Sequence, residues 1–216
     1  MSRAQEKSYK NAGDFLIPFS DSIVDFSRCF GNDNPVTVEI GFGMGKATAE
    51  IAQANPEKNY VGIEVFRAGI GKLLWEIEKR SLSNIRIIEH DAVEVIEKMI
   101  GSASVAAFHL FFPDPWPKKR HHKRRLVQKP FAELLASRLI PAGYIYMATD
   151  WENYAEAALA VLSEVPELHN PHAYAAARGT LGGSFAQGIS WRPLTKFEKK
   201  GLDKNHSIKE IYFVKK

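Results

Sequence analysis

Five short apolar runs, each followed by a stretch with helical spacing, constrain the fold of this chain more than any other feature. The apolar runs span 36–40, 59–65, 84–89, 105–112 and 142–149. Stretches compatible with helix follow them at 47–54, 66–80, 92–100 and 126–139, and a last one ends at Leu162. Parallel strands are joined by crossover helices of this kind. The alternation therefore predicts an α/β fold with a doubly wound, mostly parallel sheet.

The 216 residues, 45% of them hydrophobic, are enough for one domain with a sizeable core. A turn-rich boundary, Gly31 to Pro35, ends an N-terminal lead-in of residues 1–35. The alternating pattern occupies 36–165, and residues 166–216 contain a glycine-rich stretch at 179–188 and a charged, irregular one at 191–200. A final β-rich run at 208–214 predicts a C-terminal antiparallel strand that closes the sheet.

Composition argues against a disulfide, a metal site, a signal peptide and a membrane span. The single cysteine, Cys29, cannot form an internal disulfide or a cysteine-cluster zinc site, which suits a reducing cytoplasm. His121 and His122 are embedded in cationic sequence, so no metal site is expected. The N-terminus lacks the apolar core of a signal peptide, and no apolar run reaches the ~20 residues of a membrane span. We expect a soluble, cytoplasmic protein.

Acidic residues stand at the ends of the predicted strands. They are Glu39, Glu64, Asp91, Asp114 and Asp150. Any one of them could cap a helix or be solvated. Because the carboxyl ends of parallel strands meet at one edge of a sheet, the five together predict an acidic crevice there, where open α/β sheets bind ligands.

A glycine loop follows the first strand and narrows the choice of ligand. Its sequence, Gly41-Phe42-Gly43-Met44-Gly45-Lys46, departs from the dinucleotide pattern G-x-G-x-x-G, since Lys46 stands where the last glycine would fall. Glu39 precedes the loop, and its carboxylate would repel a phosphate but suit a cationic amine or sulfonium. The 23 residues from Gly41 to Glu64 fit a nicotinamide-dependent reductase as well.

The stretch from Phe111 to Arg125, FFPDPWPKKRHHKRR, combines an acid among prolines with a strongly basic run. Residues 118–125, hereafter the basic run, hold six Lys or Arg and no acid, which leaves 23 of the 29 basic residues against 25 acids in the remainder. A charge run is often only a solvated loop. Here the basic balance of the protein comes from one patch, which favours a polyanionic partner such as nucleic acid.

The glycine loop with its preceding acid resembles the S-adenosylmethionine loop of Rossmann-like methyltransferases. By that resemblance the backbone of Gly41, Gly43 and Gly45, together with Glu39, would hold the methionine end of S-adenosylmethionine. Glu64 would accept both ribose hydroxyls, since a carboxylate offers two acceptor oxygens to a vicinal diol. Asp91 would bond the adenine amino group. Residues 36–165 would then be the cofactor-binding core and 166–216 the substrate-side segment.

A more specific resemblance is carried by the string from Phe111 to Arg125, which is similar to the signature of the bacterial tRNA (guanine-N7)-methyltransferase family. Four further blocks match that family in order: EIGFGMG at 39–45, GIEV at 62–65, ATDWENY at 148–154 and RPLTKFE at 192–198. The resemblance adds Asp114 to the cofactor and catalytic residues. It implies substrate contacts at Lys118, Asp150, Thr195, Lys196, Phe197 and Glu198. It implies RNA contacts at Arg120, His121, His122, Lys123, Arg124 and Arg125.

The resemblance implies methyl transfer from S-adenosylmethionine to N7 of guanine 46 in the tRNA variable loop. N7 carries no proton, so we expect Asp114 to orient the base and act electrostatically, although Asp150 or Glu198 could do the same. Trp116 and Trp151 are candidates for stacking or for core packing. In the family an Arg- and Gly-containing basic segment usually precedes the sequence that stands here at Ser2 to Gln5.

Alternatives remain at this stage. Methylation of another RNA or DNA nitrogen, such as N2 of guanine or N6 of adenine, would use the same loop and the same basic run. A non-catalytic RNA-binding protein would need only the basic run. The sequence leaves the choice between a monomer and a homodimer open.

Overall fold

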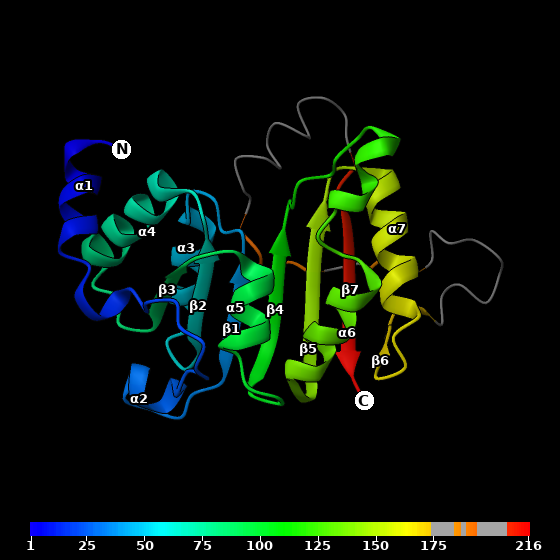
Figure 1. Ribbon diagram of the computed structural model, residues 1–216, viewed down its shortest axis with the longest axis horizontal. Coiled ribbons are helices and arrows are strands. Elements are labelled where there is room, and N and C mark those ends of the chain that lie inside the picture. Colours follow the sequence, from blue (N-terminus) through cyan, green and yellow to red (C-terminus); the bar gives the residue numbers. More distant parts are fainter. Residues whose placement is uncertain (174–183, 187–188, 194–206) are drawn as a thin grey trace.

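The computed structural model describes residues 1–173, 184–186, 189–193 and 207–216, and Figure 1 shows their arrangement. A seven-stranded sheet has the order β3-β2-β1-β4-β5-β7-β6. Its strands are β1 (Val36–Ile40), β2 (Asn59–Glu64), β3 (Ile85–Glu89), β4 (Val105–Phe111), β5 (Leu139–Thr149), β6 (Leu168–His169) and β7 (Lys209–Lys215). The first five are mutually parallel, and β7 runs antiparallel to β5 and to β6. The predicted doubly wound sheet with its antiparallel C-terminal strand is confirmed.

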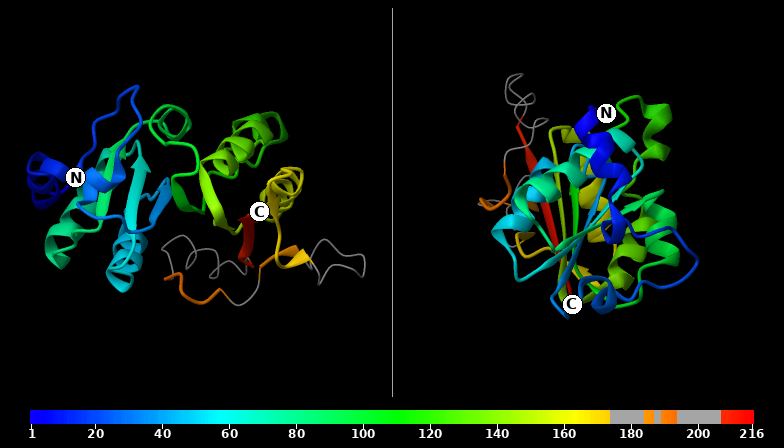
Figure 2. Two further views of the ribbon diagram at one scale, coloured as in Figure 1. Left: turned by 90° about the horizontal axis from the view of Figure 1, so that it is seen from below. Right: turned by 90° about the vertical axis from the view of Figure 1, so that its left-hand side faces the viewer.

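Helices cover both faces of the sheet (Figure 2). They are α1 (Arg3–Lys10), α2 (Phe26–Phe30), α3 (Lys46–Ala54), α4 (Arg67–Arg80), α5 (Ala92–Lys98), α6 (Lys129–Arg138) and α7 (Glu152–Ser163), with short 3-10 helices η1 (Gly13–Phe15) and η2 (Lys119–Arg124). Side chains of α5, α6 and α7 join one buried cluster, and those of α3 and α4 join a second on the opposite face. None of the helices described is both long and apolar enough to cross a bilayer.

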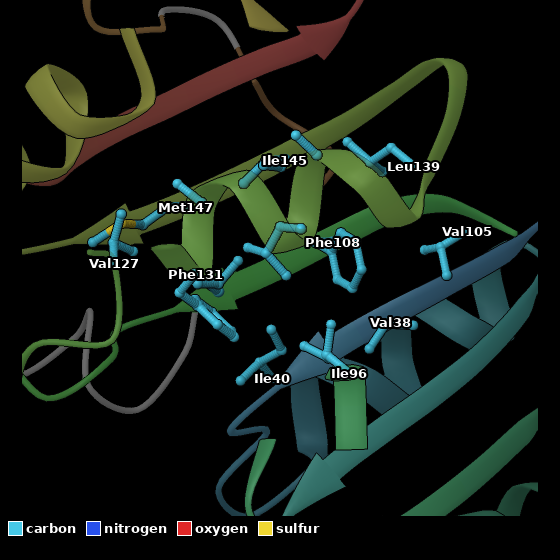
Figure 3. Close-up of a cluster of buried hydrophobic side chains, with 14 of the residues drawn as sticks. Val38, Ile40, Ile96, Val105, Phe108, Val127, Phe131, Leu139, Ile145 and Met147 are labelled. Atoms are coloured by element: carbon cyan, nitrogen blue, oxygen red, sulfur yellow. The ribbon is translucent and has the colours of Figure 1, made fainter. Parts of the chain in front are cut away.

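Strand alternation decides which side chains face which layer. Val36, Val38 and Ile40 of β1 pack with Phe108 of β4 in the cluster beneath α5, α6 and α7. Figure 3 shows Val38, Ile40 and Phe108 there. Because successive residues point to opposite faces, Glu39 points toward α3 and α4. It is only 4% exposed there. The same alternation places the valine and isoleucine side chains in one core cluster and the Glu39 carboxylate on the opposite face of the sheet.

The N-terminal lead-in is more ordered than its mixed sequence indicates. Ser2 forms a capping box with Gln5 at the start of α1, and α1 packs against α4. Beyond η1, Leu16 forms a parallel bridge with Ile87 of β3, and the N–H of Ile17 donates to the Ile87 carbonyl at 2.8 Å. The lead-in therefore covers the outer edge of β3 beside the predicted crevice.

One helix begins later than its sequence pattern predicts. Helix was expected from Leu126, but α6 starts at Lys129 with Gln128 as its N-cap residue. Pro130 lies in the first turn, where its fixed φ and missing N–H are tolerated. Leu126 and Val127 instead form a tight turn between η2 and α6, in which the Gln128 N–H donates to the Leu126 carbonyl at 2.9 Å, and the Val127 N–H donates to the Tyr154 hydroxyl at 3.2 Å.

Candidate active site

The candidate site lies where the strand order reverses. Strands β1 and β4 are neighbours, and the chain leaves them in opposite directions, toward β2 and toward β5. At such a switch point the loops after the two strands diverge and leave a crevice at the carboxyl edge of the sheet. The glycine loop follows β1 and the Pro113–Pro117 loop follows β4, so the two stretches singled out in the sequence flank one crevice.

Backbone geometry explains the glycines of the first loop. Gly41, Gly43 and Gly45 have φ of 72°, 56° and 66°, in the left-handed region that other residues rarely adopt. The loop also lies directly against the start of α4, since a Cβ on Gly69 would stand 1.9 Å from the Gly43 carbonyl oxygen. At Gly41 and Gly43 an added Cβ would meet nothing within 4 Å, so this side of the loop is open to a ligand.

Glu64, at the end of β2, is fixed by backbone donors. Its Oε2 accepts the Gly43 N–H at 2.9 Å, and its Oε1 accepts the N–H groups of Val65 at 2.8 Å and Phe66 at 3.0 Å. A carboxylate oxygen can accept more than one hydrogen bond, so Glu64 can hold this loop and still bind a hydroxyl.

Glu39 is a buried carboxyl at the base of the same crevice. Burial raises its pKa to about 7; the Thr48 hydroxyl of α3 opposes the rise, and the Glu64 carboxylate adds to it. The Thr48 hydroxyl makes no hydrogen bond of ordinary geometry. A buried carboxylate of this kind is stabilised by a cationic ligand and disfavours an anionic one. The chemistry suits an ammonium or sulfonium group.

Asp91 acts as the N-cap of α5, one of the alternatives that the sequence left open. Its Oδ1 accepts the N–H groups of Val93 at 2.9 Å and Glu94 at 3.3 Å. Large apolar side chains are exposed on the loops after β1 and β2 and in the first turn of α5: Met44 (45%), Val65 (66%), Phe66 (56%) and Val93 (40%). Single exposed apolar residues are ordinary, but four at this edge of the sheet form an apolar rim suited to a planar aromatic ring.

The loop after β4 is held in a strained conformation. Phe112 and Trp116 have φ of 54° and 44°, a region that costs a residue with a side chain roughly 1–2 kcal/mol. The Phe112 N–H is fixed by the Ala148 carbonyl of β5 at 2.8 Å. Asp114, between the two strained residues, is exposed at the edge of the crevice. Strain of this kind persists where the surroundings determine the backbone, which is common at functional sites.

The basic run folds mostly as η2 and separates into two kinds of residue. Lys118, Lys119, Arg120, Lys123 and Arg124 are exposed, whereas His121 and His122 are partly buried. The Arg124 guanidinium lies 5.0 Å from the Trp116 ring centroid, and the His121 ring forms a T-shaped pair with that ring. Arg125 is different, because it is only 5% exposed and points into the protein. The run thus presents five exposed cations beside Asp114, and its last residue is internal.

Of the other predicted residues, Asp150 follows β5 at the same edge and is partly buried. Trp151 packs against the main core cluster, which favours the core-packing interpretation. Thr195, Lys196, Phe197 and Glu198 lie outside the described residues. Arg192, just before them, is held by the Tyr146 hydroxyl at 3.1 Å and by Glu210 at 3.2 Å, and lies over the rings of Phe111 and Phe112.

Sequence reasoning missed a cluster beside the crevice. Glu89, at the end of β3, accepts hydrogen bonds from Arg67 Nε at 2.8 Å and from the Tyr9 hydroxyl. The Glu89 hydrogen bond and burial raise the pKa of Tyr9. Glu89 stood at a predicted strand end as the other acids did, but nothing in the sequence indicated that Tyr9 of α1 would reach it. In the described ranges, no group of three metal-ligating side chains is found.

A doubly wound parallel sheet in which β5 pairs with the antiparallel strand β7, with an acid and a glycine loop at its switch point, defines a Rossmann-like methyltransferase. Solved structures agree on the fold. A 16S rRNA methyltransferase, KamB, matches with a TM-score of 0.57 and 13% identity over 90% of this chain and 94% of that one. A 30S ribosomal A1408 methyltransferase from an uncultured bacterium matches with a TM-score of 0.56 and 14% identity over 89% and 95% of the two chains.

Sequence comparisons identify the family. Residues 33–211 match the model of a family described as "Putative methyltransferase". The tRNA (guanine-N7)-methyltransferase of Bordetella pertussis is 49% identical over 201 residues, covering 93% of this chain and 75% of the relative. That of Nitrosomonas eutropha is 47% identical over 215 residues, covering 99% and 92%. The chain belongs to the tRNA (guanine-N7)-methyltransferase family, as its sequence motifs predict.

Proposed function

We propose that this chain transfers the methyl group of S-adenosylmethionine to N7 of a guanine in tRNA, at position 46 of the variable loop. The observation that carries the proposal is the position of Asp114. It lies between a crevice that suits a cationic, aromatic cofactor and a row of exposed cations that suits an RNA backbone. The names of the relatives support the same activity, which would act on tRNA in the cytoplasm.

The residues around the crevice support S-adenosylmethionine as its ligand. The buried Glu39 carboxylate would face the charged methionine end, beside the open side of the glycine loop. Glu64 keeps acceptor capacity for the ribose hydroxyls. Asp91 caps α5 with Oδ1, which leaves Oδ2 for the adenine amino group. When bound, S-adenosylmethionine supplies a methyl group on a positively charged sulfur.

No residue of this chain needs to remove a proton. Guanine N7 has an in-plane lone pair and no hydrogen, so positive charge develops on the purine ring as the bond to N7 forms. The Asp114 carboxylate would stabilise that charge and could accept from the N1 and N2 hydrogens of the guanine, orienting N7. Asp150 and Glu198 are the alternatives for holding the guanine edge, and Lys118 would contact the substrate beside them.

The exposed part of the basic run would bind the tRNA backbone. Lys119, Arg120, Lys123 and Arg124 project from η2, and no ion pair neutralises them among the described residues. Phosphate contacts of this kind supply sequence-independent affinity. The Arg124 guanidinium already packs over the Trp116 ring. A base that stacks on Trp116 would therefore use the other face or displace Arg124.

The test is incubation with an unmodified tRNA transcript and labelled S-adenosylmethionine, followed by nucleoside mass spectrometry. We expect 7-methylguanosine, and no product from a transcript in which adenine replaces guanine 46. N2-methylguanosine or N6-methyladenosine would support another nitrogen as the target. Binding of tRNA without any methylation would support a non-catalytic RNA-binding protein. Continued methylation of the adenine-46 transcript would exclude position 46.

A further inference from the structure

Arg125 is the one member of the basic run that is buried, and a side chain 5% exposed cannot present its charge to a phosphate backbone. Burial lowers the pKa of its guanidinium. Within the described ranges, no carboxylate lies within ion-pair distance of it. A buried cation persists only when hydrogen bonds offset the loss of water. The location of those hydrogen bonds indicates what Arg125 does.

The guanidinium joins three parts of the site. Its Nε donates to the Pro115 carbonyl of the loop after β4 at 2.9 Å. One terminal nitrogen lies 2.8 Å from Asn153 Oδ1 in the first turn of α7 and 3.1 Å from His122 Nε2 in η2. The guanidinium also lies 4.9 Å from the centroid of the Tyr154 ring. One planar group therefore fixes the loop, η2 and α7 relative to one another, which a lysine cannot do.

The loop around Asp114 has few other ways to hold its shape. Pro113, Pro115 and Pro117 lack N–H groups and cannot form a backbone ladder. Trp116 has φ of 44°, outside the regions that a residue with a side chain prefers. Apart from Arg125, we find no donor to the backbone of residues 113–117 in the part of the chain that the structure describes. The Pro115 carbonyl is thus the attachment point of the segment.

Asp114 and Arg125 also share a neighbourhood. Burial raises the pKa of Tyr154; the Arg125 charge opposes this rise, and the Asp114 charge adds to it. Both charges therefore lie close enough to act on one phenol. We infer that Arg125 is a positioning residue: its hydrogen bond to the Pro115 carbonyl sets the direction of Asp114 and ties that loop to η2. This inference rests on the proposed methyl transfer.

The experiment compares Arg125→Ala and Arg125→Lys with Lys123→Ala, which removes an exposed cation from the same run. For each variant we would measure kcat and KM for 7-methylguanosine formation, tRNA affinity against salt concentration, and S-adenosylmethionine affinity by calorimetry. Both Arg125 variants should lose roughly 100-fold in kcat, because a small displacement of a reacting group has an effect of that size. Their salt slope and cofactor affinity should stay unchanged. Lys123→Ala should instead raise KM and lower the salt slope by about one.

Asn153 supplies a second variant that should leave the fold intact, because it is exposed on the first turn of α7. Asn153→Ala should lower kcat less than the Arg125 variants, and Asn153→Asp, which keeps an acceptor, should restore it. If circular dichroism shows that an Arg125 variant is unfolded, the two Asn153 variants test the inference in its place. Unchanged kcat in Arg125→Ala, a salt slope reduced as in Lys123→Ala, or equal activity of the Asn153 pair would overturn the inference. Absence of 7-methylguanosine from the wild-type protein would instead refute the proposed function.

Discussion

The backbone N–H of Gly43 donates to Oε2 of Glu64 at 2.9 Å, so the glycine loop after β1 and the acid after β2 hold each other in place. The other oxygen of Glu64 accepts the N–H groups of Val65 and Phe66. Three backbone donors therefore orient this carboxylate. Such preorganisation lowers the ordering cost of binding.

Glu64→Ala should weaken S-adenosylmethionine binding by 10-fold or more. The substitution removes the acceptor of the Gly43 N–H and any hydrogen bonds to the ribose, and hydrogen bonds to charged groups contribute about 1.5–3 kcal/mol each. Calorimetry with the purified protein measures the effect. Glu57→Ala, an exposed acid before β2 at the opposite edge of the sheet, is the matched control and should bind normally. Equal affinity of the two variants would remove Glu64 from the cofactor site.

Asp114→Ala should abolish methyl transfer while the fold stays intact. Asp114 is exposed, so its removal leaves no buried group unpaired and the melting temperature should hardly change. Asp114→Asn separates two roles, since it keeps an acceptor oxygen for the guanine edge but loses the charge. If charge stabilisation dominates, the asparagine variant should be nearly as inactive as the alanine variant in single-turnover assays. Near-normal turnover by Asp114→Ala would show that the residue has no part in the reaction.

Alanine substitutions at Lys119, Arg120 and Lys123 should each weaken tRNA binding and reduce the slope of log affinity against log salt by about one. All three side chains are exposed on η2. Filter binding at several salt concentrations gives the slope, and calorimetry should give an unchanged affinity for S-adenosylmethionine. A triple variant with the wild-type salt slope would mean that η2 is only a solvated helix.

The basic run shows which structural features could be predicted from the sequence and which could not. Short apolar runs placed the strands, because a parallel strand with helices on both faces is buried on both sides, and apolar spacings of three and four placed the helices. Charge counting treated Arg125 as equal to Arg124, although one lies inside the protein and the other on its surface. Burial of a single cation depends on acceptors far along the chain, here Asn153, and no local pattern encodes that distance. The contact between Tyr9 and Glu89 was missed for the same reason.

Glu39 makes the stability of the folded protein depend on pH. Its pKa rises from an ordinary 4.5 to about 7 in the folded protein, chiefly through burial. Between these two values the folded state binds a proton that the unfolded state does not, so stability falls as the pH rises. The contribution of Glu39 is therefore fully present below about pH 4.5 and is lost as the pH passes through 7, a difference of at most about 3 kcal/mol.

Glu39→Gln should remove this dependence. The free energy of unfolding of the glutamine variant minus that of the wild type should be larger at pH 8 than at pH 5. Urea unfolding without ligand measures this difference. S-adenosylmethionine binding should show the opposite trend, because a cationic ligand favours the ionised carboxylate. Wild-type affinity should therefore rise from pH 6 to pH 8 more than that of the variant. If both proteins show the same pH profile in unfolding and in binding, the Glu39 carboxyl is not the group that titrates in this range.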